Sequence, residues 1–281
     1  MIGAAVALSL LAAALHGTWN VLVKVSGDPL VTFRRATFAA LAITSVPGAI
    51  AWLVLGRPGL SVHAFVLCAM SATLETSYLW LLAAAYGRGE LSVVYPIARG
   101  TAPLLAVAAG LGLLGERLSS LQLAGVGLLL LGIVAVTLPQ TSGRATVPAL
   151  LTGVAIAGYV SIDRVGVRLS TPWLYGWLLI ALISLELVVS TWVAARLRQA
   201  PARVAPAWPQ AFLIGAFMWG GYLLVLWALS LAPLAVVAPV RETAIVAVAV
   251  WGVWKLRERK GAAMKLSGAL ATLAGVALLA A

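Results

Sequence analysis

Long apolar runs, separated by short polar or proline- and glycine-containing breaks, dominate the pattern of this chain. The run from Leu123 to Leu138, for example, contains no charged residue. A membrane-spanning helix needs about 20 mostly apolar residues, because each residue adds about 1.5 Å to a helix and the hydrocarbon layer is about 30 Å thick. Strands of a membrane barrel would instead alternate between polar and apolar positions, and these runs do not. The pattern therefore predicts membrane-spanning helices.

Ten such segments are predicted along the chain. The first five cover residues 2–24, 31–55, 62–86, 91–114 and 120–139. After a polar break, the second five cover residues 147–163, 172–195, 208–231, 234–256 and 263–281. The connections between segments are short, so they leave no room for a soluble domain. We expect an all-α, multi-pass membrane protein with ten transmembrane helices.

The two sets of segments match when one is shifted by 143 residues against the other. The shift aligns prolines and glycines, namely Pro29 with Pro172, Pro96 with Pro239, Gly125 with Gly268 and Gly132 with Gly275. An odd number of helices per half places the second half upside down relative to the first. We therefore predict two inverted-topology five-helix repeats, residues 1–139 and 147–281, joined by a loop at residues 140–146. This architecture is found mainly in transporters.

Composition agrees with a membrane location, since 63% of the 281 residues are hydrophobic and 10% are charged. The net charge of +11 does not indicate a nucleic-acid partner, because basic residues of membrane proteins collect in cytoplasmic loops and at anionic headgroups. The single cysteine, Cys68, can form neither an intramolecular disulfide nor a Cys-based metal site.

The basic residues divide unevenly between the two sides of the predicted bundle. Loops after odd-numbered segments hold 13 of the 19 Lys and Arg residues: Lys24, Arg34, Arg35, Arg88, Arg144, Arg196, Arg198, Arg203, Lys255, Arg257, Arg259, Lys260 and Lys265. The other side holds Arg57, Arg117, Arg164 and Arg168. The positive-inside rule places the richer side in the cytoplasm, and therefore both termini outside.

Several short strings together resemble the EamA group of the drug/metabolite transporter superfamily. They are Trp19 to Lys24, Phe33-Arg34-Arg35, and Gly115-Glu116-Arg117-Leu118 followed by Gln122, Gly125 and Gly132. A degenerate copy, Leu256-Arg257-Glu258-Arg259, precedes Gly268 and Gly275 and departs from the pattern in its extra basic residues. The resemblance covers nearly the whole chain and is greatest to bacterial amino-acid exporters of the YddG type. It implies a ten-helix metabolite or amino-acid exporter of a bacterial inner membrane, with a central cavity.

Charged residues within the predicted helices are the main functional candidates. A charge inside hydrocarbon costs about 2.5–3.5 kcal/mol on insertion scales, so it persists mainly where it faces a cavity or a partner. Five residues meet this description: Glu75, Arg99, Glu186, Arg241 and Glu242. Pairing of Arg with Glu between helices, which would only lock the bundle, is the alternative for each one. For the whole set a cavity is favoured.

The segment 91–114 carries the clearest group of candidates. Tyr95 and Arg99 are four residues apart on one helical face, and Pro96 removes a backbone hydrogen bond between them. Pro239 recurs in the segment 234–256 and is followed by Arg241 and Glu242. An Arg suits a substrate carboxylate and a Glu suits an ammonium group, so an amino acid fits such a site. Kinks that serve only packing are the alternative role of both prolines.

We predict ten substrate-binding residues and two helix hinges. Arg99 and Arg241 are assigned to the substrate carboxylate, and Glu75 and Glu242 to its ammonium group. The aromatic wall is assigned to Trp19, Tyr78, Tyr95, Tyr159, Trp219 and Tyr222. The hinges are Pro96 and Pro239. Glu75, Glu186 and His16 are candidates for carrying a coupling proton, and transport without ion coupling stays open.

The predicted function is secondary transport. The sequence lacks a phosphate-binding loop, HExxH and paired Cys/His ligands, so we expect no cofactor, no metal site and no ATP-driven transport by this chain alone. The expected activity is export of small zwitterionic metabolites of the threonine, methionine and phenylalanine type by alternating access. The alternatives are efflux of lipophilic cations or transport of another small metabolite.

An enzyme is not expected, because neither of the two His residues lies near an Asp. The expected partners are a small-molecule substrate and the lipid bilayer. The chain is expected to act as a monomer, with a homo-oligomer as the alternative.

Overall fold

The computed structural model describes residues 1–88, 91–137, 146–198, 204–244 and 262–280, and in these residues it contains helices and no strand. The helices are α1 (Ile2–Val25), α2 (Pro29–Val54), α3 (Val62–Tyr86), α4 (Leu91–Ala108), α5 (Ser120–Thr137), α6 (Thr146–Gly166), α7 (Pro172–Arg198), α8 (Trp208–Leu231), α9 (Leu234–Arg241) and α11 (Ala262–Ala280). A π-helical turn, Ala109–Leu113, extends α4, and a 3-10 turn, Val167–Leu169, extends α6. The all-helical fold expected from the hydrophobic pattern is confirmed.

Six helices of the described chain are long and apolar enough to cross a membrane: α1, α2, α3, α6 with its 3-10 turn, α7 and α8. Three further apolar helices are shorter, at residues Ile97–Leu113, Ser120–Val136 and Leu266–Leu279. The predicted segments 62–86 and 208–231 coincide with α3 and α8. The predicted segment 234–256 begins as α9, which ends at Arg241, and residues 245–256 lie outside the described chain.

Local sequence signals explain where some of these helices begin. The Asp28 side chain accepts a hydrogen bond from the Val31 N–H at 3.0 Å, and Pro29 follows it at the first helical position of α2. The Ser61 hydroxyl accepts from the Ala64 N–H at 3.1 Å and begins α3 in the same way. Such caps satisfy backbone donors that have no partner within the helix.

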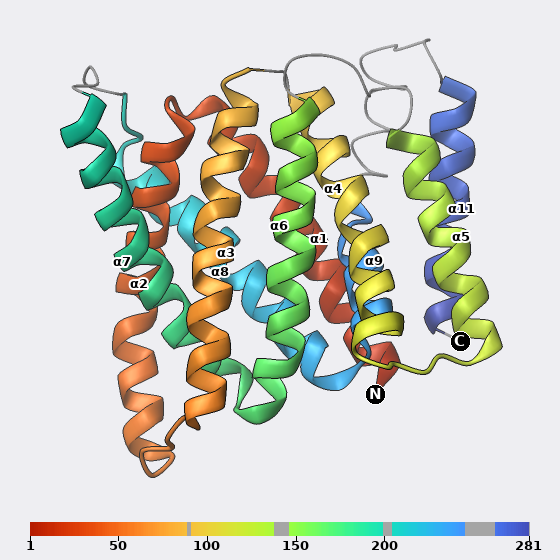
Figure 1. The fold of residues 1–281 in the computed structure, drawn as a ribbon, viewed down its shortest axis with the longest axis horizontal. Coiled ribbons are helices and arrows are strands. Elements are labelled where there is room, and N and C mark those ends of the chain that lie inside the picture. Colours follow the sequence, from red (N-terminus) through yellow and green to blue (C-terminus); the bar gives the residue numbers. More distant parts are fainter. Residues whose placement is uncertain (89–90, 138–145, 199–203, 245–261, 281) are drawn as a thin grey trace.

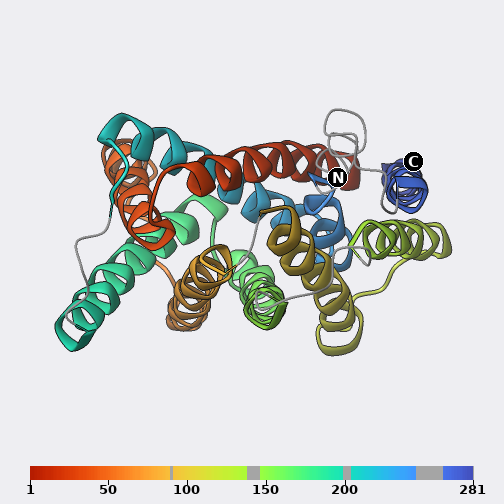
Figure 2. The same cartoon turned by 90° about the horizontal axis from the view of Figure 1, so that it is seen from above.

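The helices form two layers, each of which combines elements from early and late in the sequence. In Figure 1, α7, α3, α6, α4 and α5 form the front layer, and α2, α8, α1, α9 and α11 lie behind them. Viewed from above in Figure 2, α2 and α7 lie at one end of the bundle and α5 and α11 at the other. Both chain termini lie at the same edge of the bundle (Figure 1). The space between the layers therefore receives side chains from both halves of the chain.

Glycines bring α5 and α11 into close contact. A Cβ atom on Gly132 would lie 2.5 Å from the Gly268 carbonyl oxygen, and one on Gly275 would lie 2.6 Å from the Gly125 carbonyl oxygen. Backbones of membrane helices approach this closely where small residues face one another. The glycine pairs identified in the sequence thus lie at one interface, where they have a packing role.

Candidate functional site

A small cavity lies between the two layers and is lined by residues of six helices. The lining consists of His16, Trp19, Thr37, Glu75, Tyr78, Leu79, Tyr159, Ile180, Ile183, Met218, Trp219 and Tyr222. Its volume is about 30 Å³, which is room for about two water molecules at about 15 Å³ each. An amino acid does not fit this volume.

Aromatic rings make up much of the cavity wall. The ring centroids of Tyr78 and Tyr159 are 5.7 Å apart, as are those of Tyr159 and Tyr222. Trp219 continues the series at 6.3 Å from Tyr222, and Trp19 lies on α1 at 5.9 Å from His16. Separations of this size are favourable for edge-to-face and tilted ring pairs. The structure brings six predicted site residues to the cavity: Trp19, Glu75, Tyr78, Tyr159, Trp219 and Tyr222.

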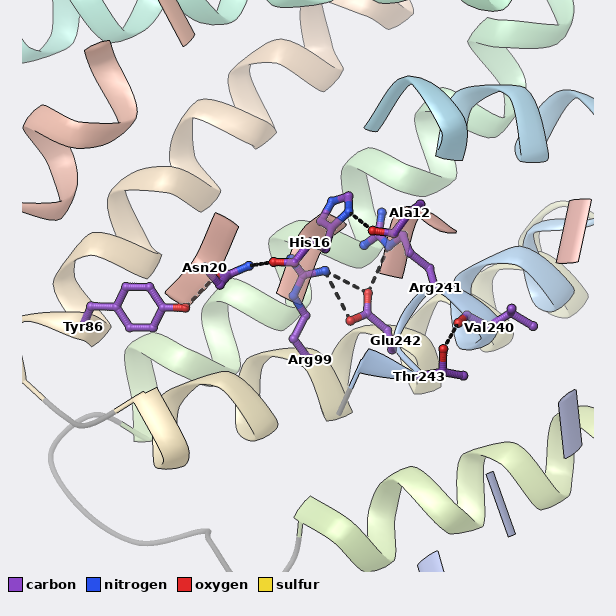
Figure 3. A network of polar contacts seen from close by, with 9 residues as sticks. All are labelled: Ala12, His16, Asn20, Tyr86, Arg99, Val240, Arg241, Glu242 and Thr243. Atoms are coloured by element: carbon purple, nitrogen blue, oxygen red, sulfur yellow. Dashed lines mark hydrogen bonds and ion pairs between the residues drawn. The ribbon is translucent and has the colours of Figure 1, made fainter. Parts of the chain in front are cut away.

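Three further predicted residues form a buried ionic cluster. Arg99 Nη1, on α4, donates to both carboxylate oxygens of Glu242, at 3.1 and 3.2 Å. Arg241 Nε donates to Glu242 Oε1 at 3.0 Å, as Figure 3 shows. All three side chains are at most 3% exposed. Two guanidinium groups therefore share one carboxylate, which leaves the cluster with a net positive charge.

The end of α9 positions this cluster. Pro239 lies inside α9, and the helix ends at Arg241, so Glu242 occupies the turn that follows. The Glu242 N–H donates to the Pro239 carbonyl at 3.0 Å, and the Thr243 hydroxyl donates to the Val240 carbonyl at 2.8 Å (Figure 3). The end of the helix thus places Glu242 where it meets Arg99 of α4.

The ionic cluster lies close to the cavity. The charges of Arg99 and Arg241 act electrostatically on His16, and also on Tyr78 and Tyr159. His16 Nδ1 lies 2.8 Å from the Ala12 carbonyl oxygen, which fixes the orientation of the ring at the edge of the cavity (Figure 3). The positive charge of the cluster therefore adjoins the aromatic wall.

Several buried polar atoms around the cavity have no hydrogen-bond partner within the described chain. They are Glu75 Oε1, Trp19 Nε1 and, in the adjoining cluster, Arg241 Nη1. More than about 90% of buried polar groups in proteins are paired, so a group of such atoms at one cavity needs an explanation. One acceptor and two donors are available there to a bound molecule.

The remaining predicted residues lie elsewhere or outside the described part of the protein. Glu186 is not at the cavity; it is half-buried at the outer contact of α3 and α7, where its Oε1 accepts from the Thr73 hydroxyl at 3.0 Å. The backbone of Tyr95 and Pro96 belongs to α4, but their side chains lie outside the described part of the structure.

Sequence reasoning missed Asp163, a fully buried carboxylate on α6. Its Oδ1 accepts from the Tyr175 hydroxyl at 2.8 Å, and its Oδ2 accepts from the Tyr222 hydroxyl. The predicted segment ended at residue 163, which placed Asp163 at the membrane surface, whereas the helix continues to Gly166. The available signal was the repeat shift of 143 residues, which aligns Asp163 with Asn20, a polar residue inside the first predicted segment.

Glu116, in the most specific string of the family resemblance, has a structural role. Its carboxylate accepts from the N–H groups of Leu234 and Ala235, at 2.7 and 2.9 Å, and from Arg164 Nε at 3.0 Å. These N–H groups belong to the first turn of α9, where backbone N–H groups have no acceptor within the helix. Glu116 thus anchors the helix that carries Arg241.

The described chain contains no group of three His, Cys, Asp or Glu side chains that could hold a metal ion. A scan against protein-family models and a search of curated proteins each find no match. A solved structure described as "Crystal structure of protein" is similar, with a TM-score of 0.67 at 16% sequence identity, over 98% of this chain and 95% of that chain. At this identity the likeness concerns the fold alone. The chain therefore shares its helical arrangement with a solved protein over nearly its whole length.

Proposed function

We propose that this chain is a secondary transporter of the EamA type that exports small zwitterionic metabolites across a bacterial inner membrane. Neutral and aromatic amino acids of the threonine, methionine and phenylalanine type are the proposed substrates. The observation that carries the proposal is a pair of buried atoms of opposite character without a hydrogen-bond partner in the described chain, namely Glu75 Oε1 at the cavity and Arg241 Nη1 in the adjoining cluster. The ammonium group of an amino acid would pair with the former, and its carboxylate with the latter.

The geometry refines the roles assigned to the charged residues. Glu242 is held by Arg99 and Arg241, so in the proposed mechanism it keeps the two arginines in place and does not contact the ammonium group. A substrate carboxylate would compete with Glu242 for the guanidinium donors, because these side chains offer positively charged donors and no acceptor atom. Glu75 remains the proposed ammonium ligand, and Pro96 and Pro239 the proposed hinges.

Alternating access would follow from ten spans arranged as two inverted repeats, which we propose for residues 1–139 and 147–281. Residues 143 positions apart meet at the site: His16 and Tyr159, Thr37 and Ile180, Glu75 and Met218, Leu79 and Tyr222 all line the cavity, and Arg99 pairs with Glu242. At the α5–α11 interface, Gly125 contacts Gly275 and Gly132 contacts Gly268. Such reciprocal contacts are those of a two-fold axis, and they support the proposal.

Efflux of lipophilic cations is a second candidate, favoured by the aromatic rings that surround Glu75. A cation is attracted to aromatic faces and to a carboxylate oxygen without a hydrogen-bond partner. The two arginines next to the cavity oppose this function, because they would repel such a substrate.

Exchange of radiolabelled threonine, methionine and phenylalanine across liposomes that contain the purified protein tests the proposal. We expect saturable exchange of at least one of them, and a reduction of about tenfold or more in Glu75→Gln, since a charge-assisted hydrogen bond contributes about 1.5–3 kcal/mol. Glu186→Gln is the matched control, because it also removes a carboxylate from a predicted membrane-spanning helix but lies away from the cavity.

The control should exchange at the wild-type rate. Equal exchange by the Glu75→Gln and Glu186→Gln proteins would refute the site assignment. Protection of cells against cationic dyes, without exchange of any amino acid, would favour the second candidate.

A further inference from the structure

The carboxylate of Asp163 lies behind the cavity wall, and the groups that donate hydrogen bonds to it are neutral hydroxyls. Asp163 is 0% exposed, and its carboxylate accepts hydrogen bonds from the hydroxyls of Tyr175, on α7, and Tyr222, on α8. The Ser71 hydroxyl, on α3, also faces it. An ionised carboxylate inside a bundle costs several kcal/mol unless a cation compensates it, and such residues in membranes mark functional positions. The placement of Asp163 therefore calls for a role beyond packing.

The chemistry of its partners distinguishes Asp163 from two other buried carboxylates. Glu242 and Glu116 are held by guanidinium and backbone N–H groups, which only donate hydrogen bonds. A hydroxyl both donates and accepts. Tyr175 and Tyr222 donate hydrogen bonds to Asp163 when it is ionised, and one of them can accept a hydrogen bond from the carboxyl O–H when Asp163 is protonated. Asp163 can therefore gain and lose a proton and keep both partners.

Tyr222 connects Asp163 to the cavity. Its ring lines the cavity, while its hydroxyl contacts Asp163. A tyrosine has one hydroxyl hydrogen, so when Tyr222 donates to an ionised Asp163 it has only lone pairs left for any other group. When Asp163 is protonated and donates to Tyr222, that hydrogen becomes available to a different acceptor. The protonation of Asp163 thus changes what the cavity wall can bind.

A comparison with Asn20 separates a structural role from one that needs a charge. Asn20 lies 143 positions before Asp163, and its Oδ1 accepts from the Tyr86 hydroxyl at 2.6 Å. A neutral amide is therefore sufficient to hold a tyrosine hydroxyl at the equivalent position of the first half. The carboxylate in the second half supplies a proton acceptor that this packing does not require.

The surroundings of Asp163 contain groups of both charges. From α3 it faces Cys68 and Glu75, from α9 Arg241, and on its own helix the neighbouring Arg164 is paired with Glu116. Glu75 also lines the cavity and disfavours a second negative charge nearby, whereas Arg241 favours one. A substrate ammonium next to Glu75 would offset the repulsion between the two carboxylates.

We propose that Asp163 is a proton-binding site that couples transport to a pH gradient, with Tyr222 relaying its protonation state to the cavity. The inference rests on the proposed transport function. Ionised Asp163 favours bound substrate, and a proton that binds to Asp163 favours its release. Each favours the departure of the other, which is the requirement for exchange of a proton against a substrate.

The test compares two measurements on the same liposomes, which contain wild-type or Asp163→Asn protein and radiolabelled threonine, methionine or phenylalanine. One is exchange at equal pH on both sides, and the other is accumulation driven by a pH gradient. We expect the ratio of gradient-driven accumulation to equal-pH exchange to exceed one in the wild type and to fall to about one in Asp163→Asn. Glu186→Gln is the control and should keep the wild-type ratio, because Glu186 lies away from the cavity against Thr73 and the proposal assigns the coupling proton to Asp163 in its place.

A wild-type ratio retained in Asp163→Asn overturns the inference. Tyr222→Phe leaves the carboxylate in place and breaks the relay, so its ratio should also fall; it carries the test if Asp163→Asn does not fold. Absence of exchange by the wild type at equal pH would count against the proposed transport function, which is a separate outcome.

A measurement that needs no substrate tests the proton site even if the wild type exchanges none of the three amino acids. The infrared spectrum of the purified protein, recorded as a function of pH, should contain the carbonyl band of a buried protonated carboxyl. The band should lose intensity in Asp163→Asn and persist in Glu186→Gln. An identical titration in wild type and Asp163→Asn would contradict a proton site at Asp163.

Discussion

At the scale of single residues, the cluster of Arg99, Arg241 and Glu242 combines a structural and a proposed functional role. The predicted alternative for such charges, pairing between helices, is what the hydrogen bonds of Arg99 with Glu242 show. The unpartnered Arg241 Nη1 is what the proposed carboxylate contact uses. The same residues can therefore hold α4 against α9 and remain able to bind a substrate.

Because Arg99 and Glu242 are paired, we expect the effects of their substitutions on the free energy of unfolding to be non-additive. Removal of one partner from a buried ion pair costs about 3–5 kcal/mol, because it leaves the other charge uncompensated. Glu242→Ala should lower the free energy of unfolding by about this amount, and Arg99→Ala by less, because Arg241 still pairs with Glu242. The double variant should lower it by about 1–3 kcal/mol less than the sum of the two. Denaturant unfolding of the purified protein in detergent micelles measures all three values.

Arg117→Ala is the control for this cycle, since its side chain is exposed. Its unfolding free energy should differ from that of the wild type by less than about 0.5 kcal/mol. Strict additivity of the Arg99 and Glu242 substitutions would show that the ion pair does not stabilise the protein.

At the scale of helices, close packing of α5 on α11 depends on the absence of side chains at a few positions. Gly132 leaves no space for a methyl group, since its Cβ would lie 2.3 Å from Thr272 Oγ1 and 2.5 Å from a backbone oxygen of α11. Gly127 lies on the same helix, and a Cβ atom added there would meet no neighbouring atom within 4 Å. The two glycines therefore lie on the same helix, but only Gly132 is packed against α11.

Gly132→Ala should lower the free energy of unfolding by about 1–3 kcal/mol, because overpacking forces the two helices apart. Gly127→Ala should be neutral or stabilise the protein by up to about 1 kcal/mol, since alanine is the better helix former. Thermal unfolding of both variants in the same detergent gives the comparison. A similar loss in both would mean that the α5–α11 contact is not tight in the folded protein.

At the scale of the whole molecule, orientation in the membrane follows from charge. The N- and C-terminal ends of the chain lie at one edge of the bundle (Figure 1). The basic residues Lys24, Arg34 and Arg196 lie near the helix ends at the other edge, namely the end of α1, the start of α2 and the end of α7. The positive-inside rule therefore predicts that both ends of this chain lie outside the cytoplasm.

A reporter fused after Ala281 tests this orientation. Alkaline phosphatase, which requires the periplasm, should be active there, and a fluorescent protein that folds only in the cytoplasm should stay dark. A control fusion in the loop between α3 and α4, at Gly87, should give the reverse result. Fluorescence from the fusion at Ala281 would overturn the predicted topology.

The sequence by itself determined the class of the protein and the extents of most helices, for a physical reason. A membrane-spanning helix satisfies its backbone hydrogen bonds internally and needs only an apolar run of sufficient length, and both properties are local. The cost of burying a charge also made Glu75 recognisable as a cavity candidate before any contact was known.

Only the tertiary structure decided which of those polar groups meet. Glu186 satisfies the same sequence criterion as Glu75, yet α7 turns it toward Thr73 at the outer contact with α3. Asp163 is buried because the packing of α6 turns it toward Tyr175 of α7 and Tyr222 of α8, and α6 continues past it to Gly166. Partners such as Arg99 and Glu242 belong to different helices far apart in the chain, and the crossing of α4 and α9 that joins them is set by packing over the whole bundle.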